Sequence, residues 1–109
     1  VFVCAWFIFL LFFCGFLPPK SAARKRFLGE HRSFPSTLII YESVHRIEKF
    51  LGEIVTVLGG DRIISVGREL TKKFENSVTG SADAVRAKVL SQARKGEFVV
   101  LIAPEDFEL

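Results

Sequence analysis

The sequence predicts an α/β domain in which a mixed β-sheet has helices packed on its faces. Short runs rich in β-branched and aromatic residues are typical of buried strands, at residues 11–17, 37–41, 62–67 and 97–103. Segments with helical hydrophobic spacing lie between some of these runs. With 109 residues, half of them hydrophobic and a quarter charged, the chain suits one small domain, and its composition excludes a disordered protein.

The first 17 residues, VFVCAWFIFLLFFCGFL, carry no charged side chain, and three interpretations of them stay open. A buried strand over residues 11–17 would follow an apolar stub, residues 1–11, that is foreign to the domain. A membrane helix of this length would span about 25 Å of a hydrocarbon core of roughly 30 Å, with its basic flank in the cytoplasm. The run could also form a hydrophobic surface that packs against a partner missing from this chain. Because the chain begins at Val1 and contains no Met, we expect it to be a piece of a longer protein or to have a mis-assigned start.

The first half of the chain is expected to contain two helices around a strand. One helix runs from Ser21, which can cap it, to about Arg32. A turn at residues 35–36 leads to a buried strand at residues 37–41. The clearest helix starts at Ser43 and ends at Gly59 and Gly60, because apolar residues between them recur at the spacing of one helical face. These residues are Ile47, Phe50, Leu51, Ile54, Val55 and Leu58.

The second half is expected to add three strands and one helix, so that the predicted order is β-α-β-α-β-β-α-β. Residues 62–67 form a strand, and residues 74–79 form a weaker strand that Gly80 closes. Ser81 caps a helix that stops near Gly96. Residues 97–103 form the last strand, and the acidic tail PEDFEL occupies residues 104–109. The inward residues of the last helix are Val85, Val89, Leu90 and Ala93.

Polar clusters lie at the carboxyl ends of the predicted strands, which is where ligands bind in open α/β sheets. Residues 41–46 end one strand, residues 68–72 follow the next, and Ala103 ends the last. We therefore expect these segments to share one edge of the sheet and to form the functional site.

The first cluster combines a carboxylate, an imidazole and a guanidinium. Glu42, His45 and Arg46 could supply a base, an acid and a clamp for an anion. Two structural interpretations compete, because Glu42 would also be favoured by the dipole of the following helix and Arg46 would pair with it. In the second cluster, Arg68 leaves a strand end and points into a cleft, although the alternating charges after it are also typical of a solvated loop.

Basic residues are concentrated around the first predicted helix. Such a patch suits contact with phosphates through release of counterions, without reading of the base sequence. A solvated helix face is the alternative, and anionic lipid would serve equally if the apolar head is a membrane anchor. The patch consists of Lys20, Arg24, Lys25, Arg26 and Arg32.

Several site classes are missing from the sequence. It has no glycine-rich phosphate loop of the G-x-G-x-x-G or Walker type and no zinc-ligand spacing of Cys and His. Cys4 and Cys14 are too few for a disulfide framework, and thiols in an apolar run are usually inert. We therefore expect no metal, and a glycine loop for a cofactor must lie outside this chain.

Five linked segments occur in a characteristic order between residues 12 and 103. They are GFLPPK at 15–20 followed by AAR at 22–24, LIIYESVHR at 38–46, LGGDR at 58–62, RELTK at 68–72 with Glu75, and KGEF at 95–98. In these segments the chain resembles the ribosomal RNA small subunit methyltransferase I family of the tetrapyrrole methylase superfamily. Val44 stands where family members often have Pro, and residues 1–11 do not resemble the polar, turn-forming segment of the family.

The resemblance implies an activity and an architecture. Members of this family use S-adenosylmethionine to methylate the ribose 2′-hydroxyl of a cytidine in small-subunit ribosomal RNA, in the cytoplasm. They consist of two α/β domains with the cofactor in the cleft between them, usually as homodimers. Residues 12–103 would be the second, C-terminal domain, and the N-terminal domain with the cofactor loops would lie outside this chain.

The resemblance and the expected sheet edge together give the candidate residues roles. Glu42 or His45 would take the proton of the attacking 2′-oxygen, while Arg46 and Arg68 would act beside them by steering phosphate or ribose. The other candidates are Glu69, Lys72 and Glu75 for the substrate pocket, Tyr41, Glu42 and Ala103 for the cofactor, and the basic patch for RNA. The alternative from another class is a non-catalytic α/β module that is membrane-anchored or docks a partner.

Overall fold

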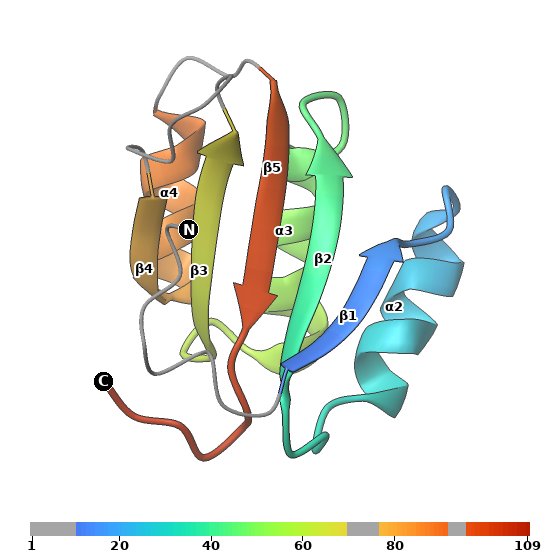
Figure 1. Ribbon diagram of the computed structural model, residues 1–109, viewed down its shortest axis with the longest axis vertical. Helices are drawn as coiled ribbons and strands as arrows, with labels where there is room; N and C mark the ends of the chain where they lie inside the picture. The colour runs from blue at the N-terminus through green and yellow to red at the C-terminus, as the bar shows by residue number, and fades with distance from the viewer. Residues whose placement is uncertain (1–10, 70–76, 92–95) are drawn as a thin grey trace.

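The computed structural model describes residues 11–69, 77–91 and 96–109, which form a mixed sheet and helices packed against it (Figure 1). The sheet has five strands in the order β1-β2-β5-β3-β4. The strands are β1 (Leu11–Phe16), β2 (Thr37–Ser43), β3 (Ile63–Glu69), β4 (Ser77–Ser81) and β5 (Glu97–Ile102). The helices in the described ranges are α2 (Ser21–Glu30), α3 (Ile47–Leu58) and α4 (Ala82–Leu90). The predicted α/β class with a mixed sheet is confirmed.

The directions of the strands decide which chain segments meet. β1 is parallel to β2, whereas β5 is antiparallel to both of its neighbours, β2 and β3. β2 and β3 therefore run in the same direction and end at the same edge of the sheet, with β5 between them (Figure 1). We call this edge, where Ser43 and Glu69 lie, the carboxyl edge.

The helices all pack on one face of the sheet, so that the main core lies between them and the strands (Figure 1). Alternate residues of the strands supply the sheet side of this core, as the two-residue repeat of a strand requires. α3 lies in the middle and contacts both α2 and α4. The fully buried residues of α3 are Ile47, Phe50, Leu51 and Ile54, which confirms its predicted apolar face.

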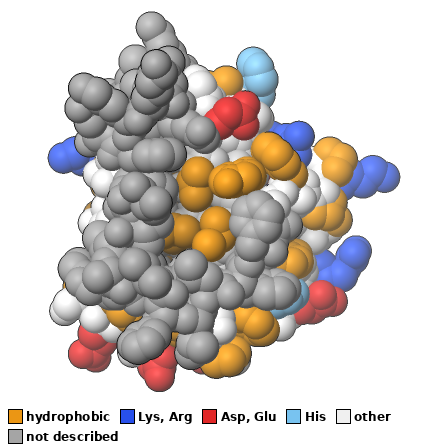
Figure 2. All heavy atoms as spheres, viewed as in Figure 1, with side chains coloured by type: hydrophobic (Ala, Val, Ile, Leu, Met, Phe, Trp, Pro, Cys, Tyr) orange, Lys and Arg blue, Asp and Glu red, His pale blue; other side chains and the backbone are white. Residues whose placement is uncertain are grey.

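The other face of the sheet carries a smaller apolar cluster and no described helix. Val99, Leu101 and Ala103 are buried there, with Ile39, Tyr41, Ile63 and Phe107 packed around them. Figure 2 shows hydrophobic side chains gathered near the middle of this face. Phe16 belongs to the same side, where its ring lies 5.7 Å from the ring of Tyr41 while 63% of the residue stays exposed.

The apolar head is described only from Leu11 onward. A strand at residues 11–16 is confirmed by β1, but it lies at the edge of the sheet and its Phe16 is exposed, so the predicted burial does not hold at that residue. The predicted stub lies almost wholly in residues 1–10, outside the described residues. No helix in the described part of the chain is long and apolar enough to cross a membrane.

Several predicted boundaries were wrong because strand pairing extends beyond the apolar runs. Glu42 and Ser43 continue β2 by pairing with Phe98 and Glu97, so α3 begins at Ile47 and not at Ser43. β3 likewise continues through Arg68 and Glu69 on the other side of β5. Cross-strand hydrogen bonds satisfy the backbone there, and this pairing overrides the local preference of polar residues for a helix start.

Smaller differences concern caps and ends. Ser81 caps α4 as predicted, with its hydroxyl accepting a hydrogen bond from Ala84 N at 3.3 Å. Ser21 is not a cap, because Lys20 precedes the first turn of α2 and the Ser21 hydroxyl donates instead to Glu53. α4 ends at Leu90, well before Gly96, and β4 runs from Ser77 to Ser81 with Gly80 inside it. Phe74 and Ala93, named in the predicted strand and helix, lie outside the described residues.

Candidate functional site

Glu42 lies at the carboxyl edge, but it is a core residue of β2 and not a surface residue after the strand. The alternation of β2 places it on the same face as Leu38 and Ile40, under the helices, and it is only 1% exposed. One carboxylate oxygen, Oε1, accepts a hydrogen bond from Ser43 N at 3.0 Å. The other, Oε2, is buried and has no hydrogen-bond partner among the described residues.

His45 and Arg46 lie in the turn that joins β2 to α3. The turn is closed by a hydrogen bond from Arg46 N to Ser43 O at 3.1 Å. Arg46 is the N-cap residue of α3, its side chain is 38% exposed, and its Nε lies 3.9 Å from Oε1 of Glu42. His45 is exposed. The predicted pairing of Arg46 with Glu42 is thus present, whereas the prediction that Glu42 directly precedes a helix beginning at Ser43 is wrong, because α3 begins at Ile47.

Arg68 and Glu69 reach the same edge from β3. Arg68 and Glu42 both pair with Phe98, and Glu69 and Ser43 both pair with Glu97. The backbones of Glu42 and Arg68 are therefore two strand spacings apart, which is about 10 Å. The expectation that the polar ends of β2 and β3 share one edge is confirmed for these backbones. The other predicted pocket residues, Lys72 and Glu75, lie outside the described residues.

Tyr41 and Ala103 do not join Glu42. Tyr41 lies on the opposite face of the sheet, in the cluster with Ala103. Ala103 follows β5, which is antiparallel to β2, and it therefore lies at the end of the sheet opposite the carboxyl edge. There its N–H donates to Ile63 O at 3.0 Å and its carbonyl accepts from Arg62 at 3.2 Å. The expectation that Ala103 shares the site edge was wrong, because the sequence did not reveal the direction of β5.

Within the predicted basic patch, Arg24 differs from its neighbours. It is 1% exposed, and its guanidinium forms two hydrogen bonds of 2.7 Å with the carboxylate of Glu53, itself 3% exposed. It also donates to the carbonyls of Pro18 and Pro19, at 3.3 and 2.7 Å. Because of the hydrogen bond to Glu53, the pKa of Arg24 is raised despite burial. Lys20, Lys25, Arg26 and Arg32 are exposed.

The burial of a second arginine, Arg62, was not predicted from the sequence. Arg62 is 7% exposed and joins two chain segments by donating to Ala103 O and, at 2.8 Å, to Arg32 O. Burial lowers the pKa of Arg62. Neither its position before β3 nor its charge indicated burial, so no signal in the sequence separated it from a surface residue.

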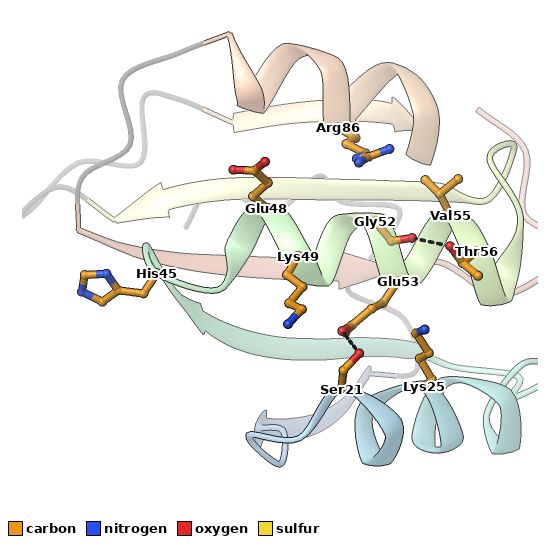
Figure 3. A pocket seen from close by; sticks show the side chains of 10 residues that line it. All are labelled: Ser21, Lys25, His45, Glu48, Lys49, Gly52, Glu53, Val55, Thr56 and Arg86. Carbon is orange, nitrogen blue, oxygen red and sulfur yellow. Dashed lines mark hydrogen bonds between the residues drawn. The ribbon is translucent and has the colours of Figure 1, made fainter.

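A groove of about 500 Å³ runs over the outer face of α3, between α2 and α4 (Figure 3). α2 contributes Ser21 and Lys25, α4 contributes Arg86, and His45 lies at one end in the preceding turn. The groove residues of α3 are Glu48, Lys49, Gly52, Glu53, Val55 and Thr56. Sequence reasoning missed Lys49, Gly52 and Arg86, although the polar face of the predicted helix was the signal that could have found the first two. The described residues contain no group of three or more His, Cys, Asp or Glu that could hold a metal ion.

Comparison with known proteins identifies relatives by sequence. No protein-family model matches the chain. A protein of Xylella fastidiosa named ribosomal RNA small subunit methyltransferase I is 42% identical over 92 residues, covering 83% of this chain and 34% of the relative. Proteins of the same name from Mesorhizobium japonicum and Vibrio cholerae are 41% and 43% identical, covering 86% and 83% of this chain and 32% of each relative.

By sequence, this segment belongs to the ribosomal RNA small subunit methyltransferase I family. The resemblance inferred from the five linked motifs is confirmed. The chain spans about a third of the length of the curated methyltransferase I relatives that it matches. The longest of the motifs that characterise the methyltransferase I resemblance, residues 38–46, builds β2 and the turn at the carboxyl edge.

Proposed function

We propose that this chain is the C-terminal, RNA-contacting domain of an enzyme that methylates the 2′-hydroxyl of a cytidine ribose in small-subunit ribosomal RNA. The observation that carries the proposal is the agreement of the relatives, which bear one name and match at least 83% of the chain at 41–43% identity. A ribosomal RNA substrate would place the activity in the cytoplasm. In this proposal residues 12–103 form the domain, and the complete protein is a homodimer of two-domain chains.

S-adenosylmethionine is the methyl donor that we infer, but the candidate cofactor residues do not fit a single site. Tyr41 and Glu42 lie on opposite faces of the sheet, and Ala103 lies at its other end. We therefore assign the cofactor loops to an N-terminal domain, which would lie in the two thirds of the relatives that this chain does not span.

Among the candidate bases, exposure favours His45. Methylation of a hydroxyl requires the oxygen to lose its proton as it attacks, so a base within hydrogen-bond reach of the substrate accelerates the reaction. His45 is exposed at the turn, and imidazole is the side chain best suited to exchange a proton near neutral pH. Glu42 is too buried to reach a substrate on the surface. We propose that His45 is the base and that Glu42 is a positioning residue, which holds the turn through Ser43 N and Arg46.

The arginines and the exposed part of the basic patch have the supporting roles in this proposal. Arg46 is partly exposed beside His45, where it could hold a phosphate or the ribose, and Arg68 is the next-to-last residue of β3, at the same edge. Of the basic patch, we propose phosphate contacts for Lys20, Lys25, Arg26 and Arg32. Arg24 is left out because its guanidinium is buried against Glu53.

The base assignment is tested in a chimera in which this chain replaces the matching third of the Xylella fastidiosa relative. Methyl transfer to ribosomal RNA is measured from pH 5.5 to 9 with labelled S-adenosylmethionine. His45→Ala should lower the rate about 10²–10⁴-fold, the usual contribution of a general base, and should remove the rise of the rate with pH. Glu42→Gln should lower the rate less and keep the pH profile. A His45→Ala variant with the wild-type rate and profile would show that the base is another residue.

A further inference from the structure

The groove over α3 is lined by three cations, Lys25, Lys49 and Arg86, and by the carboxylates of Glu48 and Glu53. The ion pairs within the described part of the chain are Arg24 with Glu53 and Arg46 with Glu42. Lys25, Lys49 and Arg86 line the groove without an ion-pair partner there. The carboxylate of Glu53 is already held by Arg24 and Ser21. The three cations outnumber the two carboxylates of the lining, Glu48 and Glu53, so the groove suits an anion.

Arg86 is the residue that points most clearly to a ligand. Its Nε is buried and has no hydrogen-bond partner among the described residues, and a buried donor left without an acceptor is costly. The guanidinium lies over the backbone of α3, where an added Cβ on Gly52 would be 3.5 Å from Nη2 and 3.9 Å from Nε. Arg86 as a whole is only half-buried and lines the groove, so an anionic oxygen lying beside Gly52 could pair with its guanidinium.

Gly52 lets the guanidinium of Arg86 lie close to α3 at this point of the groove. Glycine in the interior of a helix is less stable than alanine, so a glycine here weakens α3. Its missing side chain leaves room for the guanidinium of Arg86, which comes from α4 and lies beside Gly52 (Figure 3). The groove thus combines an excess of cations over carboxylates with an arginine placed along the middle of one helix.

We propose that this groove binds the phosphates of an RNA strand. The inference rests on the proposed function and extends it, because His45, the proposed base, lines one end of the groove. α3 has 12 residues and is about 18 Å long, which is enough to contact several consecutive nucleotides and lead the strand toward His45. Apart from Val55, the groove is lined by polar residues and glycine, whereas a membrane surface would favour apolar side chains next to the cations.

The test uses the 109-residue chain and a fluorescently labelled single-stranded RNA, with binding measured by anisotropy at several salt concentrations. Lys49→Gln and Arg86→Gln should each weaken binding about three- to tenfold and reduce the slope of log K against log salt by about 0.7 for each lost phosphate contact. Lys88→Gln is the matched control, because Lys88 is an exposed cation of α4 that does not line the groove. It should leave affinity and slope unchanged.

A second pair of variants tests the groove without changing charge. Gly52→Gln places a side chain beside the guanidinium of Arg86 inside the groove and should weaken RNA binding about tenfold. Ala87→Gln adds the same side chain to an exposed position of α4 outside the groove and should not weaken it. Circular dichroism checks that each variant is folded. The proposal is overturned if the two controls weaken binding as much as the groove variants, or if none of the groove variants changes it.

Vesicles containing phosphatidylserine distinguish a membrane ligand. Groove variants that lose vesicle binding and keep RNA binding would assign the groove to lipid and overturn the proposal. The proposed function has its own readout, methyl transfer by the chimera. Normal methyl transfer by a chimera that carries Lys49→Gln and Arg86→Gln would contradict RNA binding by the groove. It would not contradict the proposed methyltransferase function.

Discussion

At the scale of single residues, neighbouring basic side chains of α2 have different environments. A helix turns by about 100° per residue, so Arg24 faces α3 while Lys25 and Arg26 face solvent. Arg24 is tolerated in the core because Glu53 and the carbonyls of Pro18 and Pro19 satisfy its guanidinium. A run of charges in the sequence therefore does not define a charged surface, and the buried member joins α2 to α3 and to the connection between β1 and α2.

Removal of the carboxylate from this pair should destabilise the protein strongly. In Glu53→Ala the guanidinium of Arg24 stays buried without its counter-charge, which typically costs about 3–5 kcal/mol. Urea unfolding followed by circular dichroism measures the loss. Glu30→Ala, which removes an exposed carboxylate from the end of α2, should change the free energy of unfolding by no more than about 0.5 kcal/mol. Equal effects of the two substitutions would contradict a structural role of the pair.

The same pair predicts a dependence of stability on acid. Burial opposes ionisation of Glu53, but hydrogen bonds from Arg24 and Ser21 and the charge of Arg24 outweigh it, so that the pKa lies below its usual value of 4.5. A lowered folded pKa gives stability that is complete above the usual value and is lost as pH falls through the folded pKa. Wild-type protein should lose more stability than Glu53→Gln when pH falls from 6 to 3. Parallel stability curves for the two proteins would contradict this.

The burial of Glu42 was predictable from the alternation of residues along its strand. Counting by two along β2 from Leu38 and Ile40 leads to Glu42 and places it on the core face. For Arg24 and Arg62 no such pattern exists, because their burial depends on partners 29 and 41 residues away in the chain. The burial of a single charged residue was therefore predictable only where the residue continued the alternating buried positions of a strand.

At the scale of elements, the amphipathic helix and the apolar strands were predictable, and their ends were less so. The apolar spacing from Ile47 to Leu58 gave the core face and length of α3, and Gly59 ends it with φ of 101°. The start of α3 was wrong by four residues, because the pairing of Ser43 with Glu97 depends on a strand far along the chain. The local spacing of apolar residues thus predicted the middle of each helix or strand, whereas pairing between distant strands determined where it begins or ends.

Two glycines at α3 should respond to alanine in opposite directions. Gly52→Ala should stabilise the protein by about 0.5–1 kcal/mol, because alanine favours the helix and the new Cβ meets Arg86 only at 3.5 Å or more. Gly59→Ala should destabilise it by about 1 kcal/mol or more, because a side chain is strained at the positive φ of this position. Thermal unfolding of both variants measures the difference. Destabilisation by Gly52→Ala would contradict the described packing of Arg86.

At the scale of the whole molecule, the position of β5 organises both the fold and the candidate site. β5 lies between β2 and β3, so Glu42 and Arg68 flank Phe98 while Ala103 is carried to the other end. The sequence predicted these strands, but not their order or direction, because such pairings join residues far apart in the chain. The ends of β2 and β3 lie at one edge, as expected, because the two strands run in the same direction. Ala103 does not lie at that edge, because β5 runs in the opposite direction.

The central claim is that this chain supplies the RNA-contacting part of a ribose methyltransferase, and one measurement tests it directly. The chimera is expressed in a bacterium that lacks its own enzyme of this kind, and small-subunit ribosomal RNA is digested to nucleosides for mass spectrometry. We predict that 2′-O-methylcytidine returns with the chimera and not with the relative truncated at the same boundary. A chimera that leaves 2′-O-methylcytidine at the level of the truncated control, or that methylates a base instead, would contradict the claim.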